Sequence, residues 1–170
     1  SIKNTLDEIN NEINDLGNTG ESLHRDPFRP GMGTTLTAVV VVGRAVYFGH
    51  IGDSRGYLLR NGELSQITED HSLVGEQLRN GLITVEEMNS HPLRNLLTQA
   101  LGLRQAITPF ICVQTVNVGD FIILCSDGIH NFLSNKSITE LVSHSSENEV
   151  TGALVEAAID SGSDDNLTVL

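Results

Sequence analysis

The 170-residue sequence has few basic residues, no tryptophan and only two cysteines. Ten Lys and Arg stand against 22 Asp and Glu, which gives a formal net charge of −12 at pH 7. A chain this acidic repels a phosphate backbone, so nucleic acid is not an expected partner. Cys112 and Cys125 share no C-x-x-C spacing and each lies in an apolar run. They predict buried free thiols and a reducing, cytoplasmic location.

Long apolar runs are also missing. The longest, residues 38–42, is far shorter than the roughly 20 residues that span a bilayer, so the sequence predicts no membrane association. Hydrophobic residues make up 39% of the chain, which is enough for the core of a single globular domain. We find no internal repeat, and we expect a monomer.

Hydrophobic spacing predicts an N-terminal helix, then a surface loop over residues 18–30, then strands. The apolar positions of the helix are three or four residues apart, and Gly17 supplies a stop signal: Ile2, Leu6, Ile9, Ile13 and Leu16. Two hairpins are expected next. The first joins residues 35–42 to 45–51, and the second joins residues 56–60 to 63–67 through Asn61-Gly62, a strong turn signal.

Residues 72–101 have helical character that is repeatedly interrupted. The interruptions are Gly81, the capping-box pair Thr84 and Glu87, and the dipeptide His91-Pro92. Short helices on an excursion from the fold are therefore expected. The rest of the chain predicts strands at 110–116, 121–125 and 166–170, and helices at 138–143 and 147–158.

Aspartates recur where the predicted strands end or turn. Asp53 follows one strand, Asp127 follows another, and Asp164 and Asp165 precede the last one. Magnesium and manganese prefer oxygen ligands, and loops that converge at one sheet edge can supply them. Aspartate and glycine also populate turns for purely local reasons, so this pattern alone leaves both interpretations open.

Two other motifs suggest hydrolases. The segment 52–56, GDSRG, matches the G-x-S-x-G nucleophile elbow with Ser54 as nucleophile, but an elbow needs a helix after the serine and a strand is predicted there. Asp160-Ser161-Gly162 resembles an aspartic protease triplet, but no second triplet supplies the required carboxylate pair. The histidines show no zinc-ligand spacing: His50, His71, His91 and His130.

Six segments, taken in order, resemble the metal-dependent protein phosphatase family, the type 2C serine/threonine phosphatases, in its bacterial single-domain form. They are 31–35 (GMGTT), 52–55 (GDSR), 67–72 (ITEDHS), 91–95 (HPLRN) running into 99–102 (QALG), 124–128 (LCSDG) and 164–168 (DDNLT). Each segment is weak alone, but together they extend over most of the chain.

The resemblance implies an α+β fold, a four-layer α-β-β-α sandwich of two antiparallel sheets flanked by helices. It also implies that the fold is incomplete at the N-terminus, because residues 1–170 correspond to part of a catalytic domain. Residues 72–101 would form the flap, a variable excursion beside the site that influences substrate choice.

The implied activity is removal of phosphate from phosphoserine and phosphothreonine in protein substrates. Two Mn²⁺ or Mg²⁺ ions, with a weaker third, would activate the attacking water, so no residue beyond the metal ligands is catalytic. Asp127 and Asp165 match metal-binding aspartates of the family, and Asp53 matches an aspartate that shares the third ion with Asp127. The scaffold residues near the site would be Gly33, Thr34, Arg55, Asp70, Gly128 and Asn166.

The chain also departs from the family pattern. Family members carry, before the first helix, a phosphate-binding arginine, an acidic pair and an Asp-Gly-x-Gly-Gly loop whose aspartate bridges both metals, and none of these is in this sequence. Asn131 stands where some members have an acidic residue near the third metal. Two other functions therefore stay open: a phosphatase-like module that binds or regulates without catalysis, and an unrelated hydrolase using Ser54.

Overall fold

The computed structural model describes residues 1–19 and 32–170, so most of the loop expected over 18–30 lies outside the described residues. In the described part, six strands form two three-stranded antiparallel sheets, ordered β1-β2-β5 and β4-β3-β6. The strands are β1 (Leu36–Val42), β2 (Ala45–Ile51), β3 (Arg55–Arg60), β4 (Glu63–Gln66), β5 (Phe110–Thr115) and β6 (Phe121–Cys125). The helices are α1 (Ile2–Thr19), α2 (Leu73–Arg79), α3 (Val85–Ser90), α4 (Asp127–His130), α5 (Asn135–His144) and α6 (Val150–Asp160).

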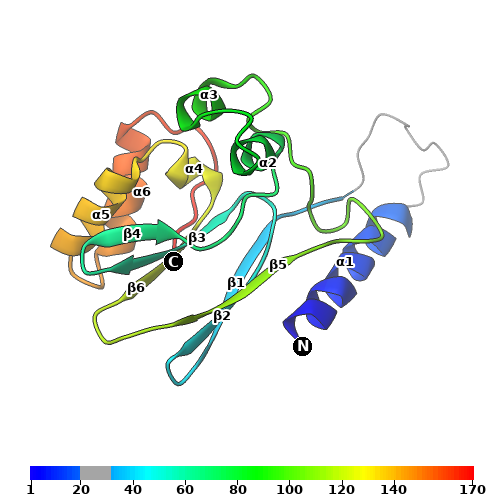
Figure 1. The fold of residues 1–170 in the computed structure, drawn as a ribbon, viewed down its shortest axis with the longest axis horizontal. Coiled ribbons are helices and arrows are strands. Elements are labelled where there is room, and N and C mark those ends of the chain that lie inside the picture. The colour runs from blue at the N-terminus through cyan, green and yellow to red at the C-terminus, as the bar shows by residue number, and fades with distance from the viewer. Residues whose placement is uncertain (20–31) are drawn as a thin grey trace.

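The elements stack in four layers, as expected from the sequence. Helices α5 and α6 lie together on the side of the β4-β3-β6 sheet, and α1 lies on the side of the β1-β2-β5 sheet (Figure 1). The core between the β4-β3-β6 sheet and helices α5 and α6 contains Tyr57, Ile123, Ile138 and Leu154, each at most 5% exposed. Burial of these large apolar side chains is the main force that holds the helices on the sheet.

Both predicted hairpins are present, because their turns contain residues that tolerate a left-handed backbone. Gly43 has φ +61° between β1 and β2, and Asn61 and Gly62 have φ 52° and 78° between β3 and β4. This conformation is what a two-residue hairpin turn requires, and Asn-Gly is the pair best suited to it.

Helix α1 packs closely on β2 because Gly49 has no side chain. A Cβ at Gly49 would lie 2.6 Å from Cγ2 of Ile2, so any larger residue would displace the helix. The buried Asn10 side chain accepts a hydrogen bond from the Gly102 N–H (2.8 Å) and donates one to the Arg104 carbonyl (2.9 Å). The expected stop at Gly17 is wrong, since the helix continues to Thr19.

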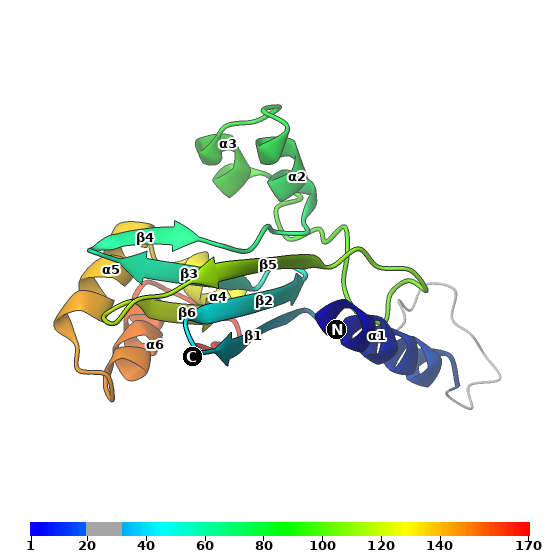
Figure 2. The same cartoon turned by 60° about the horizontal axis from the view of Figure 1, so that its bottom comes forward.

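Within residues 72–101, the two short helices α2 and α3 stand away from the sheets (Figure 2). The end of this range is buried, and Leu101 pairs with Thr34 just before β1. The predicted capping box at the start of α3 is present, with the Thr84 side chain bound to the Glu87 N–H and the Glu87 side chain bound to the Thr84 N–H. Ser72 caps α2 in the same way through the Gly75 N–H, at 3.1 Å.

Three expectations about the other segments need correction. The last expected strand, 166–170, is reduced to an isolated bridge between Val169 and Cys125. Helix α4 was not expected, because four residues are too few to show a helical period. Both cysteines are free, but Cys112 is only half-buried while Cys125 is buried.

No helix within the described ranges has the length and apolarity needed to cross a membrane.

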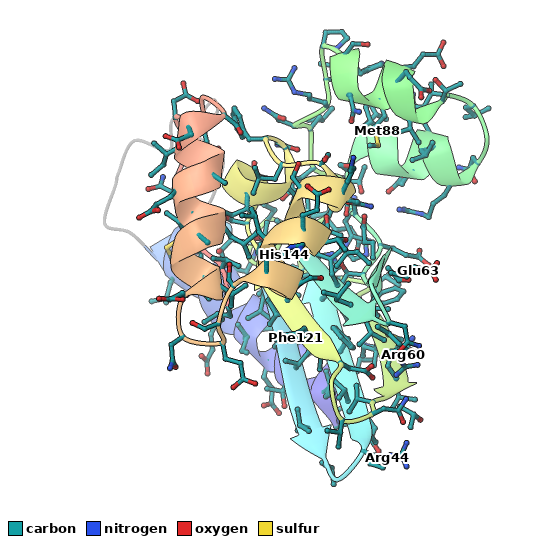
Figure 3. All side chains as sticks on the ribbon, turned by 90° about the vertical axis from the view of Figure 1, so that its left-hand side faces the viewer. Arg44, Arg60, Glu63, Met88, Phe121 and His144 are labelled. Carbon is teal, nitrogen blue, oxygen red and sulfur yellow. The ribbon has the colours of Figure 1, made fainter. Side chains whose placement is uncertain are left out.

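Arginines join the two sheets at one end of the sandwich. Arg60, the last residue of β3, binds the Asp120 carboxylate (2.6 Å) and the carbonyl of Thr115 in the other sheet (2.7 Å). Arg44, labelled with Arg60 in Figure 3, binds Asn117 nearby. Strand β2 begins beside Arg44 and runs to the opposite end, which places the Asp53 turn there.

Candidate metal site

Asp53 lies in the tight turn between β2 and β3. The turn begins at Gly52, which has φ +109°, a conformation that a residue with a side chain rarely adopts. A Cβ at Gly52 would also lie 2.4 Å from Cγ2 of Thr35. Glycine is therefore required on both counts, and the sharp turn leaves the Asp53 side chain half-buried at the sheet edge.

Asp127 is the first residue of α4 and follows directly after β6. The preceding residue, Ser126, ties this point to the C-terminal segment. Its hydroxyl donates to the Asn166 carbonyl (3.2 Å) and accepts from the Thr168 N–H (3.1 Å), while its own N–H donates to the Thr168 carbonyl (3.0 Å). A Cβ at Gly128 would lie 2.7 Å from the Asn166 carbonyl oxygen, so Gly128 permits this close approach.

Asp165 lies in the exposed loop between α6 and the C-terminal segment. One of its carboxylate oxygens accepts the N–H of Asn166 at 2.7 Å. The contacts of Ser126 and Gly128 with residue 166 bring this loop beside the start of α4. Thus Asp127 and Asp165, which are 38 positions apart in the numbering of the chain, lie on neighbouring loops.

The carboxylates destabilise one another's charged forms. Burial, together with the nearby charges of Asp127 and Asp70, raises the pKa of Asp53 to about 6. Burial and the adjacent Asp165 likewise raise the pKa of Asp127. Among residues 1–19 and 32–170, no arginine or lysine forms an ion pair with any of the three aspartates predicted as ligands. A divalent cation would relieve this repulsion, and carboxylate oxygens are suitable ligands for Mn²⁺ and Mg²⁺.

The described residues nevertheless bring together only part of a ligand set. Within them, no three His, Cys, Asp or Glu side chains lie close enough to hold a metal ion. A groove of about 520 Å³ lies near Glu69, His71, Arg79 and Phe110, and none of the three aspartates lines it. The donor chemistry therefore fits a metal, but six or more oxygen ligands would need to include groups beyond these.

The residues predicted from the sequence as scaffold differ in their contacts. Thr34 pairs with Leu101 through two backbone hydrogen bonds of 3.1 and 2.9 Å, and Gly33 packs where a Cβ would lie 2.7 Å from the Leu103 side chain. They attach the start of β1 to the end of the excursion. Gly31, of the same motif, lies outside the described residues.

Arg55 and Asp70 form a buried ion pair. The guanidinium donates to both carboxylate oxygens, with Nη2 at 2.7 Å and Nε at 3.0 Å from each oxygen. Gln66 donates a further hydrogen bond to Asp70 at 2.8 Å. The two charged side chains are only 15% and 10% exposed. Arg55 is thus occupied by Asp70 and is not free to bind a phosphate.

The structure gives no support to the two hydrolase motifs. The hydroxyl of Ser54 lies 2.9 Å from that of Thr35, and strand β3, not a helix, begins at the next residue. In a nucleophile elbow, a helix follows the serine directly. Asp160 and Ser161 lie at the exposed C-terminal end of α6.

Three histidines hold the Asp53 turn, a role that their positions in the sequence do not indicate. His50 Nε2 donates to the Gly52 carbonyl (3.0 Å), and its Nδ1 lies 2.8 Å from the hydroxyl oxygen of Thr37. The His71 ring stacks on His50 at 5.2 Å, and its Nδ1 accepts the Gly52 N–H at 3.1 Å. His130 Nε2 lies 3.0 Å from the Asp53 carbonyl oxygen. No spacing rule finds them, since they meet only through the fold.

Burial keeps these rings neutral. It lowers the pKa of His50 to about 4, helped by the neighbouring His71. It also lowers the pKa of His130 to about 4, helped by the positive charge of Arg55. A neutral imidazole has one donor and one acceptor nitrogen, which matches the hydrogen bonds that His50 makes.

Comparison with known proteins gives close matches. A family model described as Protein phosphatase 2C matches residues 2–158. The serine/threonine phosphatase stp of Listeria monocytogenes is 37% identical over 170 residues, covering 99% of this chain and 65% of its own length. The serine/threonine protein phosphatase PstP of Mycobacterium tuberculosis is 42% identical over 145 residues, covering 85% of this chain and 28% of its own.

The solved structures extend this likeness to the fold. The catalytic domain of the serine/threonine protein phosphatase PstP in complex with two manganese ions superposes with a TM-score of 0.80 at 37% identity. The match covers 94% of this chain and 64% of that one. This chain therefore spans less than two thirds of the length of the curated relatives that it matches.

Proposed function

Since the chain belongs to the protein phosphatase 2C family, we propose that the protein containing it removes phosphate from phosphoserine and phosphothreonine in proteins, using Mn²⁺ or Mg²⁺. The observation that carries this proposal is the group of Asp53, Asp127 and Asp165. Their loops lie at one end of the sandwich, and no ion pair within the described residues neutralises them. Carboxylates left in this state suit a divalent cation.

Each aspartate has a proposed role. Asp127 and Asp165 hold the principal ions, and Asp53 shares a weaker third ion with Asp127. When bound, the ions supply a water nucleophile at neutral pH and neutralise the charge that develops on the phosphoryl oxygens. Ser126 and Gly128 keep the Asp127 and Asp165 loops together through their contacts with residue 166.

Further ligands are part of the proposal. A hard divalent cation takes about six oxygen ligands, and water supplies only some of them. The described residues supply fewer than three side chains to any one position. We propose that the remaining carboxylates come from outside the described residues.

The test compares Asp127→Asn with the unchanged protein, because the amide keeps the shape of the side chain but loses its charge. Hydrolysis of a phosphothreonine peptide is measured against manganese concentration, with a chelator control. We expect chelator-sensitive turnover in the unchanged protein and a loss of at least about 100-fold in Asp127→Asn. The exposed Asp160→Asn is the matched control and should retain turnover. Normal turnover in Asp127→Asn would exclude Asp127 as a ligand.

A phosphatase-like module without catalysis is the alternative, and the incomplete ligand set is the observation that favours it. The two functions differ in one measurable respect. A module of this kind would bind a phosphoprotein but show no manganese-dependent release of phosphate. The same assay therefore distinguishes them.

The proposed partners are phosphorylated proteins, and we propose that the protein acts as a cytoplasmic monomer without nucleic acid or membrane. The net charge of −12 and the two free cysteines support this. We also propose that residues 1–170 form part of a catalytic domain and that 72–101 act as its flap. The position of α2 and α3, away from the sheets in Figure 2, supports a role in choosing substrates.

A further inference from the structure

We propose that His130 is a positioning residue that fixes the Asp53 carboxylate relative to Asp127, and so sets the affinity of the weaker metal position. This inference rests on the proposed function. It concerns a side chain that holds the backbone of a ligand residue and does not touch the metal itself.

His130 is the last residue of α4, and Asp127, three positions earlier, is the first. Residues three apart lie on the same face of a helical turn. The His130 side chain therefore reaches from the element that carries Asp127 toward the neighbouring Asp53 turn.

His130 Nε2 lies 3.0 Å from the carbonyl oxygen of Asp53, a residue 77 positions earlier in the chain. A carbonyl oxygen only accepts, so Nε2 carries the proton and donates it. One hydrogen bond thus joins the backbone of one proposed ligand residue to the helix that begins with another.

His130 differs from the other two histidines in the backbone group that it binds and in the element that carries it. His50 and His71 bind the N–H and carbonyl of Gly52, and His71 also donates its backbone N–H to the Gly52 carbonyl at 2.7 Å. They hold the turn against β2 and the segment before α2. His130 alone among the three comes from α4, so it determines where Asp53 lies relative to Asp127.

His130 Nδ1 is buried, and no hydrogen-bond partner for it exists in the described part of the chain. A buried acceptor without a partner is unfavourable for stability. The ring therefore contributes little to stability through Nδ1, and its one polar contact is the bond to Asp53. Removal of the ring should loosen the Asp53 turn but leave the fold intact.

The experiment measures manganese binding by calorimetry in three variants. His130→Leu and His130→Phe fill the space without a donor, and His130→Gln keeps an N–H that can reach the Asp53 carbonyl. The matched control is His144→Leu, at the exposed C-terminal end of α5 and labelled in Figure 3. Circular dichroism checks the fold of each variant.

We expect the two variants without a donor to keep the tight manganese positions and to bind the weaker ion 10-fold to 100-fold less well, the usual effect of losing a hydrogen bond that holds a ligand residue in place. His130→Gln should restore most of this affinity, and His144→Leu should match the unchanged protein. The manganese concentration for half-maximal peptide hydrolysis should rise in parallel with the weaker dissociation constant.

The outcomes separate the two proposals. If the unchanged protein binds no manganese and hydrolyses no peptide, the proposed function fails and the role of His130 fails with it. If the unchanged protein binds manganese and the variants without a donor bind it equally well, only the role of His130 is overturned. Unfolding of both those variants would also overturn it, because the ring would then be a structural element.

Discussion

The buried pair of Arg55 and Asp70 allows a sharp prediction about stability. In Asp70→Asn the side chain keeps its shape but loses its charge. The Arg55 guanidinium, 15% exposed, would then be a buried cation without a counter-ion. Removing one partner of such a pair typically costs about 3–5 kcal/mol. A domain of this size has roughly 5–15 kcal/mol of stability in total, so the loss should be large.

The chain offers a matched control on its surface. Lys3 and Asp7 lie 2.6 Å apart on α1, closer than the 2.7 Å between Arg55 and Asp70, but their side chains are 58% and 38% exposed. Exposed pairs of this kind contribute about 0–1 kcal/mol. Asp7→Asn should therefore be nearly neutral even though the distance is slightly shorter.

The assay is urea unfolding followed by circular dichroism at pH 7, which gives the free energy of unfolding for each variant. A double variant, Arg55→Met with Asp70→Leu, tests the cause. If the loss in Asp70→Asn comes from the uncompensated charge, the double variant should recover part of it. Equal losses in Asp70→Asn and Asp7→Asn would show that burial does not determine the strength of this pair.

Three further predictions follow from the turns around the site. The pKa of His50 is about 4 in the native state and about 6.5 when unfolded, so the unfolded state binds the proton first as the pH falls. The free energy of unfolding should therefore fall by roughly 3 kcal/mol between pH 6.5 and pH 4. Urea titrations of His50→Asn should lose this contribution to the pH dependence. Gly52→Ala forces a side chain to φ +109° and against Thr35, so urea unfolding should show a free energy of unfolding lowered by about 1–3 kcal/mol. In Gly128→Ala the added methyl group would press on the Asn166 carbonyl and separate the start of α4 from the loop that carries Asp165. Calorimetry should then show weaker manganese binding. Unchanged binding would contradict the importance of this close approach.

Most of the fold could be predicted because its signals are local. Asn61-Gly62 fixes a hairpin by turn chemistry alone, because both residues tolerate a left-handed backbone. Thr84 and Glu87 mark the start of α3 through side-chain contacts with the adjacent backbone. These signals depend only on neighbours in sequence.

The missed features depend on contacts between distant segments. Helix α4 is a single turn at the end of β6, and its boundary is set by the Ser126 contacts with residues 166 and 168. The histidines around Asp53 come from a strand, a loop and a helix, and only the fold brings them together. Helix α1 ends two residues beyond the predicted stop at Gly17, a difference within the usual uncertainty of helix ends.

The aspartates show why a site needs the structure as well as the sequence. In the sequence each is an acidic residue near a turn, and nothing local separates a ligand from a structural residue. In the fold they divide by their partners: Asp70 and Asp120 each bind an arginine through both carboxylate oxygens. Asp53 and Asp127 have no such partner in the described residues, and the charge of Asp127 helps to raise the pKa of Asp53.

This division follows from the two ends of the sandwich. At one end Arg60 neutralises Asp120 and ties the sheets together, so that end gains stability from its charges. At the other end Arg55 is paired with Asp70, and no ion pair in the described part of the chain neutralises the remaining carboxylates. Carboxylates that are partly buried near one another without a counter-ion lower stability, and a bound cation would relieve this cost. Metal binding and folding stability should therefore be coupled at this end of the protein and independent at the other.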